Sequence, residues 1–512
     1  MTTIEPRIVY LDFETYWSDE YTLSKMGIEQ YVRDPRFETH MLGYAEGYSE
    51  VKIALKDDVS ATLRTLQLDS PNVFTVIQNA KFDGFILSQI YGIVPSNPIC
   101  TRAMFRWIGG SRFTRESLEK QCEFLSTQAK GDFISQTKNK HMEDFTKEEI
   151  RQFLEYNIID VKTLRSNFLK MLPKMDSLAL AFIIMTEKMY LNPIFRLDLA
   201  RLREYHTELE HKQATAMEGL PSLFRFENRE AFLKALRSKK SFCSMLEEIG
   251  GVVPYKVSEK KSETAKKKIE AEIEKAKASN KDRCVIDAIY DKIATEEYMV
   301  YEPALAKTDI EFQALLASDN PDVAALCQAR AENNSSIAIS RCNSFIGIAE
   351  RGLLPVSLEP FLAWTGRYTA SNSADTTLRS DSVNIQNIPK RTGDTTLREC
   401  ILPPEGHVIV ACDSSQIEAR VLAWVAGQED LLNDFSMGAD PYCRMAESIY
   451  GEPYETIYAY TKGELAKSGE KEAIKKYKHQ RNVAKAAVLQ LGYGAGSANF
   501  SNYLWRNGIR LF

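Results

Sequence analysis

Four carboxylate residues in the first third of the chain are suited, by type and spacing, to hold divalent metal ions. Asp12 and Glu14 lie two residues apart in IVYLDFETYW, Asp83 lies in VIQNAKFDGF, and Asp160 lies in YNIIDVKTLR. Carboxylates brought together repel one another unless hard cations with oxygen ligands neutralise them. Two such ions stabilise the attacking water and the leaving oxygen in phosphodiester hydrolysis. The pattern therefore predicts a site for two Mg²⁺ ions, with Mn²⁺ as the alternative.

The elements around these residues are predicted to bring them together. Residues two apart on a strand face the same side, so the strand RIVYLDFETYW directs Asp12 and Glu14 to one point. The strand NVFTVIQ places Asp83 at a strand-to-helix turn. Tyr156 and Asp160 are four residues apart and share one face of a helix, where the tyrosine can orient a water molecule. A single carboxylate would usually be a solvated group or a helix cap, but this order and spacing favour a common site.

The order of DFET, NAKFD and YNIID resembles that of the DEDD-type 3′–5′ exonuclease superfamily in its tyrosine-bearing form. The resemblance covers residues 1–172. It implies an RNase H-like α/β domain that acts on single-stranded DNA 3′ ends. It further implies metal ligation by the four carboxylates, with Tyr156 positioning the nucleophilic water.

A second set of motifs follows in the last third of the chain. Arg481, Lys485, Leu489 and Tyr493 in RNVAKAAVLQLGYG are each four residues apart and follow one helix face. Two cations there suit a triphosphate, and the apolar and aromatic residues suit a base and a sugar, although a basic pair at this spacing is usually only a solvated face. The apolar run HVIVACD predicts a strand that delivers Asp413 to its end.

Together with TGRYTAS, NIQNIP and ACDSSQIEAR, these motifs resemble family A DNA polymerases, most closely the bacteriophage type. The resemblance implies contacts with primer–template DNA in the minor groove, where the acceptors are nearly the same for all base pairs. It also implies that Mg²⁺ ions bind at the first palm motif and that dNTPs bind along the fingers helix. The implied residues are Arg367, Asn384, Gln386 and Asn387 for DNA, Gln416, Glu418, Arg481, Lys485, Leu489 and Tyr493 for the nucleotide, and Asp413 and Lys485 for catalysis, with Asp413 as a metal ligand.

The chain departs from the family pattern at several points. Tyr442 stands where many members have a phosphate-contacting histidine, and Leu489 replaces a common aromatic residue. After Gly494 no Asp, Glu or His remains to provide the second palm carboxylate. We therefore expect a chain that stops before the last palm motif, as a fragment, an interrupted product or half of a split enzyme. The alternative to a proofreading polymerase is a stand-alone 3′–5′ exonuclease.

The secondary-structure pattern predicts three domains. Residues 1–172 have an α/β pattern, 173–350 a helical pattern and 351–512 a mixed one, and the resemblances imply that these are the nuclease domain, a thumb-like region and a partial palm and fingers of a polymerase right hand. Within the helical region, residues 258–298 are rich in Lys and Glu, which indicates a solvated helical insertion rather than a DNA contact. The fold class is thus α/β and α+β in several domains.

Composition limits the function classes. The net charge of −5 over 512 residues argues against a general electrostatic nucleic-acid binder, yet it permits a local basic cleft beside acidic metal sites. Nine cysteines without a CxxC pair indicate reduced thiols rather than a zinc or redox motif. No apolar stretch is long enough for a membrane span and no signal peptide is evident, so we expect a cytoplasmic protein, in a bacterial host if it comes from a phage. A processivity factor or a C-terminal polymerase fragment is a candidate partner.

Overall fold

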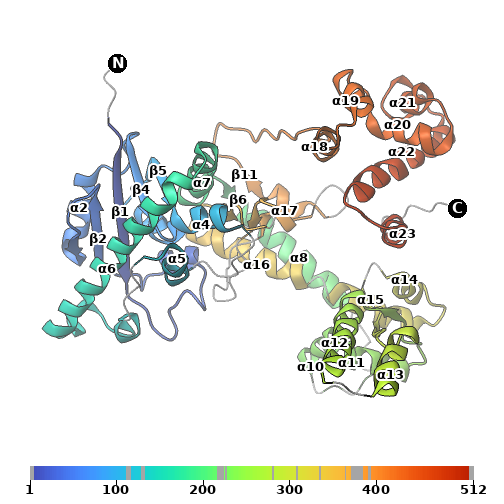
Figure 1. Ribbon diagram of the computed structural model, residues 1–512, viewed down its shortest axis with the longest axis horizontal. Helices are drawn as coiled ribbons and strands as arrows, with labels where there is room; N and C mark the ends of the chain where they lie inside the picture. The colour runs from blue at the N-terminus through green and yellow to red at the C-terminus, as the bar shows by residue number, and fades with distance from the viewer. Residues whose placement is uncertain are drawn as a thin grey trace. The chain divides into compact units, whose positions relative to one another are not determined.

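The computed structural model describes residues 5–110, 117–127, 133–215, 224, 226, 228–279, 282–306, 309–333, 336–363, 365–370, 384–389 and 394–506. Its contacts divide the chain into two compact units, each of which is described by itself (Figure 1). The first unit comprises residues 1–215 and 334–409, and the second comprises residues 216–333 and 410–512. The helical region expected at 173–350 is therefore shared between both units, and the three-domain boundaries stay a prediction.

The first unit is built on a mixed five-stranded sheet in the order β3-β2-β1-β4-β5. β1 pairs in parallel with β4, and β4 with β5, whereas the β1–β2 and β2–β3 pairs are antiparallel. The α/β fold predicted for this part is confirmed. The strands are β1 (Arg7–Thr15), β2 (Thr39–Glu46), β3 (Lys52–Leu55), β4 (Val73–Ile77) and β5 (Asn97–Cys100).

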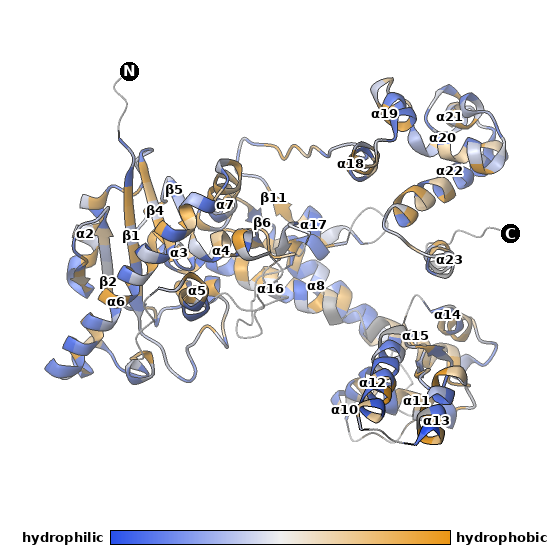
Figure 2. Cartoon of the chain, viewed as in Figure 1, coloured by the Kyte–Doolittle hydropathy of each residue, from blue (hydrophilic) through white to orange (hydrophobic). Residues whose placement is uncertain are grey.

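Several helices pack directly against this sheet. α6 (Lys147–Met171) crosses β1, β2, β3 and β4, while α3 (Ala80–Gln89) and α7 (Ser177–Leu191) pack against β5. A capping box starts α6, in which the side chains of Thr146 and Glu149 bond each other's backbone N–H groups. The strands are largely hydrophobic, as Figure 2 shows, because both faces of the central strand are covered. The packing therefore fixes α6 against the strand that carries Asp12 and Glu14.

The rest of the first unit consists of shorter helices and two-stranded pairs. α8 and α16 pack on each other around Leu202 and Phe345, and β6 pairs with β11 as β9 pairs with β10. The helices are α1 (Ile28–Arg33), α2 (Val59–Leu66), α4 (Thr101–Gly109), α5 (Leu118–Leu125), α8 (Leu199–Thr215), α16 (Ser336–Arg351) and α17 (Thr396–Glu399), and the strands are β6 (Arg196–Leu197), β9 (Leu358–Glu359), β10 (Thr369–Ala370) and β11 (Ile401–Leu402).

A buried group of charges connects three of these elements. Lys81 of α3 lies 2.6 Å from a carboxylate oxygen of Glu359 on β9, and Arg106 of α4 pairs with the other oxygen. Burial alone would raise the pKa of Glu359, but the two cations hold it below its ordinary value. Glu187 of α7 lies beside them, and burial raises its pKa to about 7. The helices α3, α4 and α7 and the β9–β10 pair thus share one ionic core.

His40 on β2 is a fully buried neutral histidine. Its ring meets the edges of Phe145 and Phe153, and burial lowers its pKa to about 4 despite the nearby charge of Glu38. An unfolded chain would protonate His40 near pH 6.5, so the unfolded state binds the extra proton first as pH falls. We expect stability to fall by on the order of 3 kcal/mol between pH 6.5 and pH 4. Urea unfolding at a series of pH values measures the free energy of unfolding. In His40→Leu this free energy should depend less on pH between 6.5 and 4. An equally steep dependence in the variant would show that another group causes the loss.

The N-terminal part of the second unit is helical. α10 (Arg229–Arg237), α11 (Lys239–Glu248), α14 (Ile310–Leu316) and α15 (Pro321–Asn333) enclose a core that includes Phe242, Phe312 and Leu326. The predicted Lys- and Glu-rich insertion forms α12 (Glu259–Ala278) and α13 (Arg283–Ala294), flanked by the paired strands β7 (Tyr255–Val257) and β8 (Tyr301–Pro303). α12 is largely hydrophilic (Figure 2), and most of its described side chains are exposed.

The C-terminal part of the second unit is a set of packed helices. α20, α21 and α22 pack together around Cys443, Ala446, Ile457 and Ala484, and α18 packs against α19 and α22. The helices are α18 (Ile417–Ala426), α19 (Glu429–Ser436), α20 (Pro441–Tyr450), α21 (Tyr454–Thr461), α22 (Lys471–Gly492) and α23 (Ser497–Arg506).

The strand predicted for HVIVACD is wrong. Residues 407–414 have no regular secondary structure, and the side chains of Val408 and Val410 are 82% and 78% exposed. A strand needs a hydrogen-bonded neighbour, and within the described residues no strand pairs with this segment. Its apolar residues therefore lie at the surface instead of in a sheet.

Among the described helices, none is both long enough and apolar enough to cross a membrane. The nine cysteines are free thiols.

Candidate metal centre and nucleotide site

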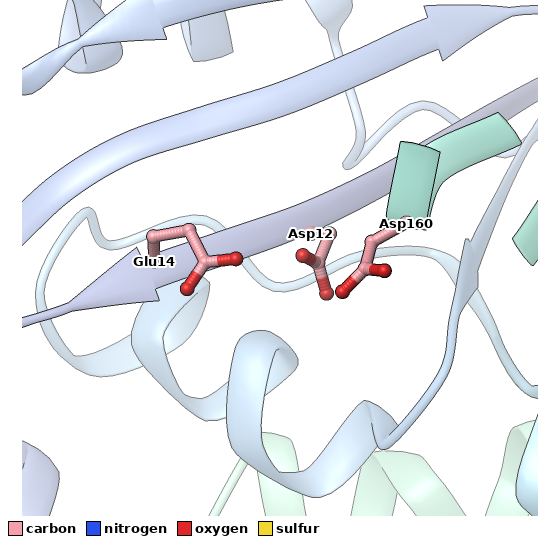
Figure 3. Close-up of side chains that lie close together, drawn as sticks. All are labelled: Asp12, Glu14 and Asp160. Atoms are coloured by element: carbon pink, nitrogen blue, oxygen red, sulfur yellow. The ribbon is translucent and has the colours of Figure 1, made fainter. Parts of the chain in front are cut away.

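Three of the four predicted carboxylates meet at one point. Asp12 and Glu14 extend from β1 and Asp160 from α6, and one oxygen of each lies within 4.8 Å of the others (Figure 3). Asp12 and Glu14 share a side of β1 because side chains alternate along a strand. Oxygens at this spacing lie within reach of one hard cation, whose metal–oxygen distances are about 2.0–2.6 Å. The donor set, three carboxylates and no sulfur or imidazole, therefore fits Mg²⁺ or Mn²⁺.

Asp83 is held beside this group but is not part of it. It lies in the first turn of α3, and its Oδ1 accepts a hydrogen bond of 2.9 Å from the backbone N–H of Phe13. Phe13 lies between Asp12 and Glu14 on β1, so Asp83 approaches the strand from the side of α3. Burial raises the pKa of Asp83 to about 7. The structure thus brings Asp83 to the correct strand without adding it to the cluster of three.

Tyr156 lies one helical turn before Asp160 on α6, as predicted. Its side chain is buried and is hydrogen-bonded to Asp160. Burial raises the pKa of Tyr156, and the negative charges of Glu14 and Asp160 raise it further, so the phenol keeps its proton. It can therefore act as a hydrogen-bond donor next to the carboxylates.

Sequence reasoning missed Asn157, which lies between Tyr156 and the predicted ligand on α6. Its side chain is fully buried, and its amide nitrogen lies 3.0 Å from Oδ2 of Asp12 and 3.4 Å from Oε1 of Glu14. The amide donates to both strand carboxylates and so fixes their orientation without adding charge. Its only signal in the sequence is its place in YNIID.

Gly43 makes room for this amide, which leads to a testable prediction. Gly43 lies opposite Asp12 in the β1–β2 register, and a Cβ atom there would lie 1.9 Å from Oδ1 of Asn157. We expect Gly43→Ala to cost about 1–3 kcal/mol of stability through overpacking. Displacement of Asn157 should also lower metal-dependent nuclease activity, measured on single-stranded DNA. Gly496→Ala, which adds a methyl group in open space, is the control; undiminished nuclease activity in Gly43→Ala would contradict the role of Asn157.

Two of the predicted DNA-contact motifs lie together in the first unit. Gln386, in a short 3₁₀ helix (Ile385–Asn387), donates from Nε2 to the carbonyl oxygen of Tyr368 at 3.1 Å. Tyr368 follows Arg367, whose side chain is exposed. Asn387 is exposed and Asn384 is half-buried. A hydrogen bond therefore connects the NIQNIP motif to the backbone of the TGRYTAS motif.

The predicted nucleotide-binding residues occupy α22 in the second unit. Nη2 of Arg481 lies 2.6 Å from Oδ2 of Asp440, and Cζ of Arg481 lies 5.1 Å from the centre of the Tyr442 ring. Nζ of Lys485 lies 5.9 Å from the same ring centre. Leu489 is half-buried further along the helix, and Tyr493 lies at its C-terminal end with its side chain 64% exposed.

The palm-motif residues are arranged differently from the prediction. Asp413 is exposed in the irregular segment before α18, and among the described residues it belongs to no group of three metal-binding side chains. Gln416 begins α18 with a left-handed backbone, φ 52°. Burial raises the pKa of Tyr442, and the charge of Glu418 contributes to the increase, which places Glu418 near the α20–α22 contact.

Comparison with known proteins finds similarity in the C-terminal part of the chain, across portions of both units. Residues 364–507 match the model of "DNA polymerase family A". The chain therefore contains a segment that matches family A DNA polymerases, and this segment is less than half of the chain. The segment is similar to the thermostable DNA polymerase I of Thermus aquaticus, 38% identical over 92 residues, 18% of this chain and 11% of that protein. DNA polymerase I of Chloroflexus aurantiacus is 32% identical over 145 residues, 27% of this chain and 13% of that protein.

DNA polymerase I of Pseudomonas aeruginosa is 34% identical over 109 residues, 20% of this chain and 12% of that protein. The chain thus spans only a small part of the length of each of these relatives. The polymerase segment includes Arg367, Asp413 and the α20–α22 helices. A solved structure, the POL domain of Pol1 from M. smegmatis in complex with DNA primer-template and dNTP, resembles the fold at a TM-score of 0.57. That likeness covers 98% of this chain and 70% of the other at 15% identity, and it concerns the fold alone.

Proposed function

We propose that this chain acts in DNA synthesis as a DNA-directed DNA polymerase of family A, bacteriophage type, with a 3′–5′ proofreading exonuclease of the tyrosine-bearing DEDD class. The observation that carries the proposal is that one chain joins a buried three-carboxylate cluster to a family A polymerase segment. Neither feature alone indicates proofreading. Their combination indicates an enzyme that both extends and trims a DNA 3′ end.

The polymerase half of the proposal rests on the residues of α22. Arg481 and Lys485 gather two positive charges beside Tyr442, and a dNTP carries a compact negative charge on its triphosphate. Phosphoryl transfer is catalysed almost entirely by positioning and charge neutralisation, which is what such cations provide. In this proposal Lys485 faces the triphosphate, Gln416 and Glu418 lie at the sugar, and Leu489 and Tyr493 lie toward the base. Arg367, Asn384, Gln386 and Asn387 contact the primer–template minor groove.

The nuclease half rests on the first unit. Asp12, Glu14 and Asp160 would hold the metal ions, and Asp83 would join them by exchanging its hydrogen bond with Phe13 for a metal contact. A bound pair of Mg²⁺ ions supplies charge neutralisation at the scissile phosphate and a more acidic water molecule. Tyr156 would donate a hydrogen bond that orients this water, and Asn157 keeps Asp12 and Glu14 in place.

Further partners follow from this proposal. The substrates are primer–template DNA, single-stranded DNA 3′ ends and dNTPs. Asp413 would hold Mg²⁺ for synthesis together with a second palm carboxylate, which we propose is supplied by a C-terminal polymerase fragment or a partner chain. The exposed apolar side chains around Asp413, including Val408 and Val410, would be covered by such a segment. We further propose a cytoplasmic location and a processivity factor as an additional partner.

A second candidate function is a stand-alone 3′–5′ exonuclease. The exposed position of Asp413, outside any carboxylate cluster among the described residues, favours this alternative for the chain on its own. It predicts metal-dependent shortening of DNA and no nucleotide incorporation.

The test is a primer–template, labelled at the primer 5′ end, incubated with the full chain, Mg²⁺ and all four dNTPs. Extension that is lost in Lys485→Ala supports the polymerase. Shortening without extension supports the stand-alone exonuclease. If the chain binds the DNA but neither extends nor shortens it, both functions are overturned.

A further inference from the structure

Tyr442 lies in the first turn of α20, where two cations of α22 lie over its ring. Its side chain is only 6% exposed, and both Arg481 and Lys485 approach the face of its ring, at 5.1 Å and 5.9 Å from the ring centre. Cations within about 6 Å of an aromatic ring centre are attracted by the negative face of the ring. Two like charges repel each other, so a shared negative surface between them offsets part of that repulsion.

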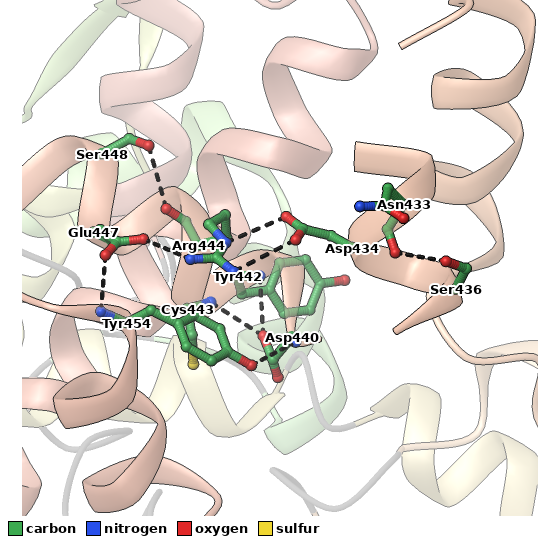
Figure 4. Close-up of polar contacts among 10 residues, drawn as sticks. All are labelled: Asn433, Asp434, Ser436, Asp440, Tyr442, Cys443, Arg444, Glu447, Ser448 and Tyr454. Atoms are coloured by element: carbon green, nitrogen blue, oxygen red, sulfur yellow. Dashed lines mark hydrogen bonds and ion pairs between the residues drawn. The ribbon is translucent and has the colours of Figure 1, made fainter. Parts of the chain in front are cut away.

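The start of α20 holds the ring in a fixed place. Asp440 caps the helix, and its Oδ1 accepts hydrogen bonds from the backbone N–H groups of Tyr442 and Cys443 at 2.9 Å and 3.1 Å (Figure 4). The backbone N–H of Asp440 in turn donates to the hydroxyl of Tyr454 at 3.1 Å. Because the other carboxylate oxygen of Asp440 pairs with Arg481, the cap also fixes the guanidinium against the ring.

The tyrosine hydroxyl has a different environment from the ring. It makes no hydrogen bond with any of the described residues, whereas the ring face contacts both cations. A group that bound phosphate directly would act through the hydroxyl. A group that positions cations would act through the ring.

We propose that Tyr442 is a positioning residue of the nucleotide site, whose ring face holds Arg481 and Lys485 together where a triphosphate binds. This inference rests on the proposed polymerase function and adds to it a role that needs no hydroxyl group. The ring brings two positive charges to one place before the nucleotide arrives, so less of the binding free energy is lost in ordering them.

The experiment measures the affinity of the full chain for dATP and for inorganic tripolyphosphate, by competition with a fluorescent dATP analogue. Tyr442→Phe keeps the ring and should bind both ligands within about twofold of the parent chain. Tyr442→Leu loses the ring and should bind both about tenfold more weakly. An equal loss for tripolyphosphate shows that the defect lies at the phosphates. Tyr290→Leu is the matched control, because it removes a ring beneath Lys277 far along the chain, and it should change neither affinity.

The outcomes separate this inference from the proposed function. If Tyr442→Phe binds as weakly as Tyr442→Leu, the hydroxyl is the functional group and the inference is overturned. If Tyr442→Leu binds like the parent while Lys485→Ala binds weakly, the inference fails and the nucleotide site stands. If Lys485→Ala binds as tightly as the parent, the nucleotide site itself fails. Should the melting temperature of Tyr442→Leu fall, Tyr442→Met, whose flexible side chain fills irregular gaps and has no ring, replaces it.

Discussion

Replacing Asp12 with alanine should lower metal-dependent degradation of single-stranded DNA by about a thousandfold or more, since a metal site contributes several kcal/mol to the transition state. Asp12 is one of three carboxylates within 4.8 Å, so its loss removes a ligand that the other two cannot replace. Binding of DNA should persist, because metal ligands contribute to hydrolysis more than to contacts with the backbone. The measurement is the rate at which a labelled oligonucleotide is shortened, beside its dissociation constant in the presence of a chelator.

In the absence of metal, Asp12→Ala should increase the stability of the fold. Three adjacent carboxylates repel one another when no cation neutralises them, so Asp12→Ala should raise the melting temperature in a chelator. Asp19→Ala, at an exposed position paired with Lys138, is the matched control and should change neither nuclease activity nor the chelator effect. Full nuclease activity in Asp12→Ala would show that the metal site lies elsewhere.

The largest loss of stability is expected from Glu359→Gln. This substitution leaves Lys81 and Arg106, both with side chains 5% exposed, without the carboxylate that neutralises them. Breaking a buried ion pair from one side typically costs about 3–5 kcal/mol, because an uncompensated charge remains in the interior. The expected result is a lower urea midpoint for the first unit with an unchanged slope.

Glu263→Gln is the control for this prediction. Glu263 pairs with Lys267 on the exposed surface of α12, so its removal should leave the urea midpoint nearly unchanged. If Glu359→Gln resembled this control, the buried charges would have to be neutralised by another group. Glu187, whose pKa is raised to about 7 by burial, is the candidate for this group. Its role would be revealed if the urea midpoint of Glu359→Gln depended more steeply on pH near 7.

The sequence predicted well those features that depend on local periodicity. The two-residue spacing of Asp12 and Glu14 and the four-residue spacing of Tyr156 and Asp160 each define one side of one element. The strands, the long α6 and α22 and the solvated α12 follow from the same kind of pattern. Three of the four predicted carboxylates consequently meet in the structure.

Features that depend on contacts between distant segments were not predictable in this way. Asn157 and Gly43 are complementary only because β2 lies beneath α6, and Asp440 meets Arg481 only because α20 packs on α22. The failure at HVIVACD has the same origin. An apolar run forms a strand only when a neighbouring strand pairs with it, and its composition carries no information about that neighbour.

The buried charges around Glu359 also determine where this chain can be divided. Lys81 and Arg106 belong to residues 1–172, whereas Glu187 and Glu359 lie beyond them. A shortened polypeptide ending at residue 172 would keep both cations and lose both carboxylates. The part of the chain that contains the five-stranded sheet is therefore not an interchangeable module: its minimal independent form must extend through α7, which ends at Leu191, and also retain the β9–β10 pair, which begins only at Leu358.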